Sequence, residues 1–226
     1  MKNIGFLKSN LIAHRGLHSK NIVENTISAF VKAINMGFII ELDVHILTDN
    51  NIVVYHDYDL KRLSNINKII ETFNYKDLSK IKIKNKYKIP TLNQVLNIVN
   101  GKVPIIIEVK DMNNNEKFYQ ILANILDNYN GEFAIQSMNP KVLDWFYKNR
   151  PNYIIGLIIF NDLNYKIFKK YTKKIDFLTV YKKQLPFKNK NMIIGWTIKN
   201  KKEYEKYKPI SDNLICENIL EYCKEK

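Results

Sequence analysis

Short apolar runs alternate along the chain with segments whose apolar residues recur at helical spacing. Nine of the apolar runs have the length and composition of strands: residues 10–14, 38–44, 52–55, 105–110, 133–137, 153–160, 175–180, 192–197 and 214–216. Helices are expected at residues 27–34, 91–99, 116–128, 140–147, 163–171, 201–207 and 219–223. Strands that alternate with helices through short loops form a parallel sheet, and about eight such units predict an α/β fold of the (β/α)₈ TIM-barrel class.

The repeat is irregular after the second strand. Only seven residues separate Val44 from Ile52, which is too short for a helix that returns to the start of a parallel strand. Nine strand candidates also exceed the eight places of the barrel. The pattern is weakest at residues 52–55 and 175–180, so the surplus candidate is expected there.

Between residues 57 and 89 the periodic pattern weakens. We interpret this segment as a small insertion over the barrel mouth, within a single domain that spans residues 1–226. It ends in a basic alternation over residues 80–88, which is more typical of a solvated strand face than of a phosphate or lipid site. A short polar insertion would suit small substrates, whereas an apolar groove would suit acyl chains.

Composition favours a soluble protein. Hydrophobic residues make up 46% of the 226 residues, mean hydropathy is −0.30, and no apolar run approaches about 18 residues. The first ten residues lack the apolar stretch of a signal peptide, so a cytoplasmic location is expected. Cys216 and Cys223 are too few for a disulfide framework or a zinc site, and we expect reduced, buried thiols.

The net charge of +14 comes from lysine, because only three of the 36 basic residues are arginine. Proteins that recognise nucleic acids favour arginine, so no specific nucleic-acid partner is expected. The charge should still attract anionic substrates and allow weak contact with an anionic membrane surface. The oligomeric state is left open.

The candidate chemistry lies near the N-terminal end. Glu41 and Asp43 alternate along one expected strand, so both carboxylates point to the same side, where a cation would relieve their repulsion. His14 and His56 each end a short apolar run and offer imidazoles for proton transfer. Together these residues indicate a hard-metal site with acid–base groups beside it.

An ordered set of motifs resembles the glycerophosphodiester phosphodiesterase family over nearly the whole chain. The motifs are His14-Arg15-Gly16, Glu24-Asn25-Thr26, Glu41-x-Asp43, His56-Asp57, Glu108-x-Lys110, Gln136-Ser137, Gly195-Trp196-Thr197 and Asp212 to Glu217. The resemblance implies a metal-dependent phosphodiesterase that hydrolyses glycerophosphodiesters to sn-glycerol 3-phosphate and an alcohol. Its small-molecule substrate would be the main partner.

The expected site residues fall at or near the carboxyl ends of the expected strands, where TIM barrels carry their chemistry. Glu41, Asp43 and Glu108 would hold one divalent cation, Mg²⁺ or Ca²⁺, with Mn²⁺ as a further option. His14 and His56 would be the general base and acid in an order that the sequence leaves open. The expected substrate contacts are Arg15 and Lys110 on the phosphate. Trp196 is expected to pack against the glycerol or the leaving group, or else to belong to the core.

His18 and His45 are left outside catalysis, although His45 should share a strand face with Glu41 and Asp43. The closing motif departs from the family pattern at Asn213 and at Cys216-Glu217, and Met138 follows Ser137. We expect these departures to affect the later strands rather than the metal–histidine cluster. Three alternatives stay open: a lysophospholipase D-like enzyme, a polyglycerol-phosphate phosphodiesterase, and a catalytically silent barrel that binds lipid or anions.

Overall fold

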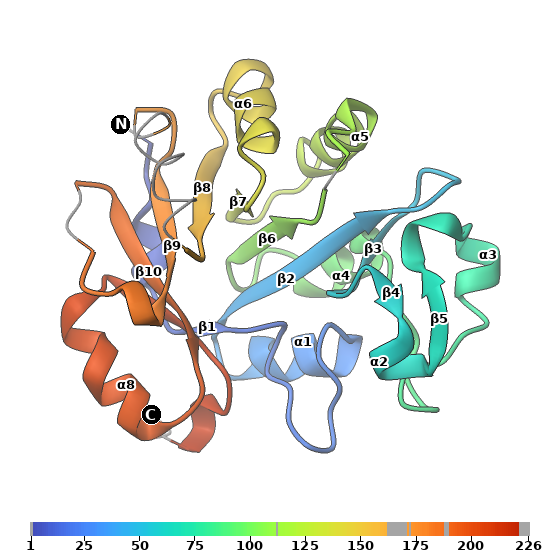
Figure 1. The fold of residues 1–226 in the computed structure, drawn as a ribbon, viewed down its shortest axis with the longest axis horizontal. Coiled ribbons are helices and arrows are strands. Elements are labelled where there is room, and N and C mark those ends of the chain that lie inside the picture. Colours follow the sequence, from blue (N-terminus) through green and yellow to red (C-terminus); the bar gives the residue numbers. More distant parts are fainter. Residues whose placement is uncertain (1, 112, 162–170, 172, 188–189, 222–226) are drawn as a thin grey trace.

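Eight parallel strands close into a barrel in the computed structural model, which describes residues 2–111, 113–161, 171, 173–187 and 190–221 (Figure 1). Neighbouring strands around the barrel follow the order β1-β2-β6-β7-β8-β9-β10-β11, and β11 pairs with β1 to close the circle. The predicted TIM-barrel fold is therefore confirmed. The strands are β1 (Ile12–Ala13), β2 (Ile39–Ile46), β6 (Ile105–Val109), β7 (Phe133–Ser137), β8 (Ile154–Ile159), β9 (Phe177–Tyr181), β10 (Met192–Ile198) and β11 (Asn213–Cys216).

The surplus strand is β3 (Ile52–Val54). It pairs antiparallel with the end of β2 and lies outside the barrel circle, as the short connection after Val44 requires. The other weak candidate, residues 175–180, is the barrel strand β9. Thus β2 and β3 form a hairpin that projects beyond the barrel toward the inserted segment (Figure 1).

Helices cover the outside of the barrel, and polar side chains begin most of them. Thr26 caps the first helix through a bond from the Ala29 amide, and Thr91 forms a reciprocal capping box with Gln94. The expected helix 163–171 lies outside the described residues apart from Tyr171, and the end of the expected closing helix lies outside them too. The helices are α1 (Ile27–Asn35), α4 (Leu92–Val99), α5 (Glu116–Leu126), α6 (Pro140–Asn149) and α8 (Lys201–Tyr207), with 3₁₀ turns at η1 (Gly5–Lys8) and η5 (Ile219–Glu221).

The interior of the barrel is apolar at its amino-terminal end. Inward side chains near the strand starts, such as Ile39, Ile106 and Phe177, pack together, and Phe6 and Leu7 of η1 join them. Burial of this apolar surface stabilises the barrel by roughly 25 cal/mol per Å². Polar side chains therefore gather at the opposite end of the barrel, where the strands have their carboxyl ends.

Residues 57–89 form a small subdomain, here called the cap, beside the carboxyl end of β2 (Figure 1). Its core joins Leu60, Ile70 and Ile83 to Val53 and Tyr55 of the barrel side. The expected basic strand over residues 80–88 is wrong: this segment contains an antiparallel bridge between Ile83 and Tyr87 around a tight turn. The expected exposure of its lysines is confirmed, because every lysine of this segment is exposed. The cap elements are β4 (Asp59–Leu60), α2 (Lys61–Ser64), β5 (Ile66–Ile69), η2 (Ile70–Thr72) and α3 (Tyr75–Leu78).

Two further sequence expectations can be compared with the structure. Cys216 is buried in β11, as expected, and its thiol donates to the Leu214 carbonyl, whereas Cys223 lies outside the described residues. Within the part of the chain that the structure describes, no helix is both long and apolar enough to cross a membrane.

Candidate active site

Three carboxylates from two neighbouring strands meet at the carboxyl end of the barrel. Asp43 of β2 lies directly opposite Glu108 of β6 in the parallel register, and Glu41 precedes Asp43 by one alternation on the same face. All three side chains are buried, and one oxygen from each lies within 4.8 Å of the others. The strand pairing itself therefore assembles the predicted acidic cluster.

These carboxylates differ in the charge they carry. Burial raises the pKa of Glu41, and the nearby charges of Asp43 and Glu108 raise it further. Burial acts in the same direction on Asp43, but Lys110 and Arg15 outweigh it and hold the pKa of Asp43 below its usual range. Three acids crowded in this way favour a bound cation.

Two basic side chains compensate part of this negative charge. Lys110 Nζ lies 2.6 Å from an oxygen of Glu108 and 3.1 Å from an oxygen of Asp43. Arg15 Nε lies 3.4 Å from Asp43, and the Arg15 amide donates to Glu41 over 3.0 Å. Three acids against two bases leave one negative charge in excess when all five groups are ionised. A divalent cation with oxygen ligands fits this donor set, because no sulfur or imidazole takes part in the cluster.

His14 follows β1 and is bonded to a residue beyond β11. Its Nδ1 lies 3.0 Å from an oxygen of Glu217, and its backbone amide donates to the Cys216 carbonyl. The expectation that the Cys216-Glu217 departure affects only the later strands is therefore wrong, since barrel closure brings β11 beside β1. Burial lowers the pKa of His14 to about 4, although the bond to Glu217 acts in the opposite direction.

His56 is held by a chain of ion pairs that reaches into the cap. Its Nδ1 lies 2.6 Å from Asp57, which accepts a bond of 2.6 Å from Arg62 of α2. Arg62 also pairs with Glu24 at 2.7 Å, and Glu24 accepts a bond of 2.6 Å from Arg15. This chain of contacts links the two predicted histidine motifs through the cap. Sequence reasoning had not identified Arg62 as part of the site.

Seven of the eight predicted site residues line one cavity of about 70 Å³: His14, Arg15, Glu41, His56, Glu108, Lys110 and Trp196. The eighth, Asp43, is 1% exposed and accepts a bond from the Asn25 amide group. A larger cavity of about 350 Å³ shares Glu108 and Lys110 with the first. The site therefore has room for a ligand larger than a phosphate group.

The remaining residues singled out in the sequence have separate positions. Trp196 lies against Tyr181 and Phe160, with ring centroids 5.7 and 6.0 Å away, while it also lines the central cavity. His45 is fully buried and contacts Glu71 of the cap through Nδ1, so it ties the cap to β2 rather than facing the cavity. His18 lies beside His14, with ring centroids 6.4 Å apart.

Comparisons with known proteins agree on one family. The model of the glycerophosphoryl diester phosphodiesterase family matches residues 14–186. A glycerophosphodiester phosphodiesterase of Caldanaerobacter subterraneus subsp. tengcongensis is 33% identical over 166 residues, which cover 67% of this chain and 67% of the relative.

Solved structures share the fold. A glycerophosphodiester phosphodiesterase of Thermotoga maritima has a TM-score of 0.76 at 26% identity, covering 92% of this chain and 94% of that chain. A phosphodiesterase of Oleispira antarctica, solved in complex with the product sn-glycerol-3-phosphate, has a TM-score of 0.79 at 18% identity, covering 92% of each chain. Since the family model spans more than half of the sequence, the chain belongs to the glycerophosphoryl diester phosphodiesterase family.

Proposed function

We propose that the protein hydrolyses glycerophosphodiesters to sn-glycerol 3-phosphate and an alcohol in a reaction that requires a divalent cation. The observation that carries this proposal is a single cavity lined by two histidines, two cationic side chains and two of the three carboxylates of the acidic cluster. Family membership supports the substrate class. Of the three proteins described above, those of Caldanaerobacter and Thermotoga bear this activity in their names, and the phosphodiesterase of Oleispira was solved with the corresponding product.

Glu41, Asp43 and Glu108 are the residues that would hold the cation, because their oxygens converge and a cation would relieve the repulsion that raises the pKa of Glu41. When bound, a divalent cation would supply Lewis-acid stabilisation of the negative charge on the phosphoryl oxygens. Mg²⁺ and Ca²⁺ both suit oxygen ligands, and Mn²⁺ is a further candidate. Arg15 and Lys110 lie in the same cavity and would pair with the phosphate, Arg15 through its planar fork.

His14 is proposed as the general base. A pKa of about 4 leaves its ring neutral near pH 7, and the bond to Glu217 favours a proton on Nδ1. Nε2 then carries the lone pair that accepts the proton of the attacking oxygen, either water or the neighbouring glycerol hydroxyl. His56 faces the same cavity and is the remaining candidate for the acid that protonates the departing alkoxide.

The adjoining cavity offers polar groups for a small alcohol such as choline, ethanolamine or glycerol. Five of its nine lining residues are polar or charged groups other than the acids of the cluster: Lys110, Asp111, Asn114, Ser137 and Asn139. Tyr58, Val109 and Met138 line the same cavity and give it an apolar side, so the lysophospholipase D-like alternative stays a candidate for the substrate test. A silent barrel is disfavoured, because every expected histidine and carboxylate is present.

A polyglycerol-phosphate substrate is a second candidate. A cavity of about 420 Å³ lies between the β1–α1 loop and the cap, and Arg62, Lys84 and Lys86 contribute positive charge to it. It adjoins the central site through Glu24, which pairs with Arg15. A further phosphate on the leaving alcohol could be held there. Charge reversal at Lys84 and Lys86 should then impair poly(glycerol phosphate) turnover and spare glycerophosphocholine.

The deciding experiment measures glycerol 3-phosphate released from glycerophosphocholine and glycerophosphoethanolamine, with EDTA, Mg²⁺, Ca²⁺ or Mn²⁺ present. Activity should require one of the cations, and His14→Ala and His56→Ala should each abolish it while the folded state persists. The double variant Glu41→Gln, Asp43→Asn should lose the bound cation. Release that is unchanged in either histidine variant would refute the acid–base assignment. If neither substrate is cleaved, lysophospholipid and poly(glycerol phosphate) test the alternatives.

A further inference from the structure

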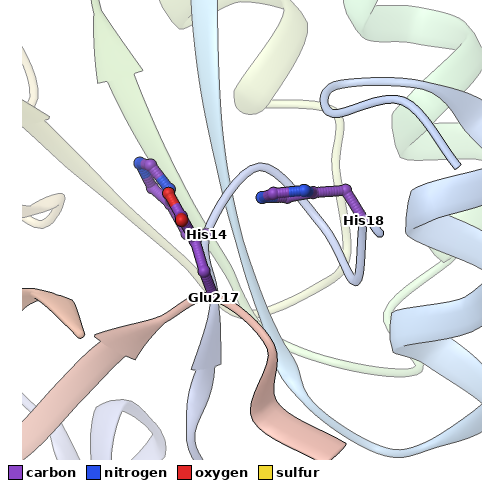
Figure 2. A group of neighbouring side chains, drawn as sticks. All are labelled: His14, His18 and Glu217. Carbon is purple, nitrogen blue, oxygen red and sulfur yellow. The ribbon is translucent and has the colours of Figure 1, made fainter. Parts of the chain in front are cut away.

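A second group of metal-binding residue types lies beside the acidic cluster. It consists of His14, His18 and Glu217, and one ligand atom of each lies within 4.8 Å of the others. The three residues come from the end of β1, the loop that follows it and the segment after β11. Figure 2 shows the ring of His18 extending toward the His14–Glu217 pair.

The proposed hydrolysis leaves His18 without a role. Its Nε2 is buried, and no hydrogen-bond partner for that atom exists among the described residues. A buried polar atom without a partner costs about 1–3 kcal/mol. The loop holds the ring in this position, because the His18 amide donates to the Gly16 carbonyl and the Leu17 amide donates to Ala29 of α1. These observations make Nε2 of His18 available to a ligand.

The donor set differs from that of the acidic cluster. Each of the two histidines can present a ring nitrogen to an ion, and Glu217 offers a carboxylate oxygen. Two imidazole nitrogens and one carboxylate suit Zn²⁺, Co²⁺ or Ni²⁺, whereas Mg²⁺ and Ca²⁺ prefer oxygen alone.

We propose that His14, His18 and Glu217 form a second, inhibitory site for a transition-metal ion of the Zn²⁺ type. The inference rests on the proposed function, in which His14 is the general base. The ion would replace the hydrogen bond between His14 Nδ1 and Glu217 with coordination by both atoms. The single proton of the neutral ring then moves from Nδ1 to Nε2 and occupies the lone pair that accepts the substrate proton. Hydrolysis stops, although the hard cation stays bound to the acidic cluster.

Small adjustments are enough to close the site around an ion. Ligand atoms in a tetrahedral zinc site lie roughly 3.3 Å apart, since each is about 2.0–2.1 Å from the metal. The His14–Glu217 pair is already at 3.0 Å, so His18 has to approach by on the order of 1 Å. Lys199 is 3.9 Å from the other Glu217 oxygen, which leaves Oε1 toward His14.

A direct binding measurement tests the site without reference to activity. Zn²⁺ is titrated calorimetrically into the protein in excess Mg²⁺, and Co²⁺ binding is followed by its visible absorption. We expect one ion per chain, with affinity reduced about 100-fold by His18→Ala and unchanged by the matched control Ser19→Ala. The variant Glu41→Gln, Asp43→Asn should still bind Zn²⁺. Absence of Zn²⁺ binding in the wild type, or equal affinity in His18→Ala, would overturn the proposal.

The inhibitory role is tested by turnover at saturating Mg²⁺. Zn²⁺ should inhibit the wild type, and a chelator selective for zinc over magnesium should restore activity. His18→Ala should turn over at the wild-type rate and resist Zn²⁺ at concentrations that silence the wild type. Equal inhibition of both proteins would refute the switch. If the wild type turned over no glycerophosphodiester, the proposed function would fail, while the calorimetric stoichiometry would still decide whether the metal site exists.

Discussion

Each of the two proposed proton-transfer histidines has a carboxylate on Nδ1. His14 contacts Glu217 at 3.0 Å, and His56 contacts Asp57 at 2.6 Å. Such a bond fixes the tautomer and the direction of the ring, so Nε2 is left to exchange protons with the substrate. Asp57 follows His56 directly and could be anticipated. Glu217 is 203 residues away from His14, and only the closure of the barrel brings it near.

Two substitutions of Glu217 should distinguish its role in orienting His14 from the effect of its negative charge. Glu217→Leu removes the acceptor at similar size, and we expect kcat to fall about 100-fold because the base loses its fixed direction. Glu217→Gln keeps an oxygen that can accept a hydrogen bond from the Nδ1–H group of His14, so kcat should fall less in this variant. The KM for glycerophosphocholine should change little in either variant. Equal kcat in the leucine and wild-type proteins would show that Glu217 does not position His14.

The β1–α1 loop is the element that carries the first histidine motif, and Gly16 determines its path. Gly16 has φ +77°, and a Cβ there would lie 2.9 Å from the backbone of Ala29 and the ring of Phe30. Both features require glycine, because an L side chain meets strain and contact together. The loop therefore packs closely on α1, which keeps His14 and His18 in place.

Two glycine substitutions provide a matched test of that packing. Gly16→Ala should lower the free energy of unfolding by at least about 2 kcal/mol, since strain and overlap add. Gly37→Ala is the control: its φ is +69°, but its nearest neighbour is 3.9 Å away, so only about 1 kcal/mol of backbone strain is expected. Urea unfolding of both variants measures the difference. Equal losses of unfolding free energy in the two variants would mean that the close contact between Gly16 and α1 adds nothing to the cost of the Gly16 substitution.

The barrel was predictable from the sequence because its strands are continuous apolar runs and its helices repeat at 3.6 residues. The cap was not, since its core is assembled from widely spaced residues such as Leu60, Ile70 and Ile83, which no short window shows as periodic. The pairing of Glu41 with Asp43 was predictable from alternation within β2, and Glu108 from the family motif at the end of an expected strand. The contacts of Arg62 and Glu217 were not, because they depend on tertiary proximity between distant segments.

Glu24 joins the β1–α1 loop to the cap and should make stability depend on pH. Burial opposes its ionisation, but Arg62 and Arg15 lower the pKa of Glu24 to about 2 from 4.5. Because the folded pKa is the lower one, this stabilisation is present above about pH 4.5 and is lost as the pH falls toward 2. Glu24→Gln should cost about 1–3 kcal/mol at pH 7 and progressively less at lower pH. The measurement is denaturant unfolding of the wild type and of Glu24→Gln at several pH values between 7 and 3. A difference in unfolding free energy that stayed constant over this range would contradict the prediction.

The charge of the whole molecule should affect capture of the substrate rather than the chemical step. A net charge of +14 creates a positive field that extends over roughly 30 Å at 0.01 M salt and about 10 Å at 0.1 M. The kcat/KM for an anionic substrate, glycerophosphoglycerol, should therefore fall about 2–5-fold between these conditions, while kcat stays constant. Glycerophosphocholine has no net charge and serves as the control, with a smaller change expected. An equal fall in kcat/KM for both substrates would mean that salt acts on the enzyme itself, for example on cation binding or on the Arg62–Glu24 pair. The excess of lysine would then not serve to attract the substrate over long distances.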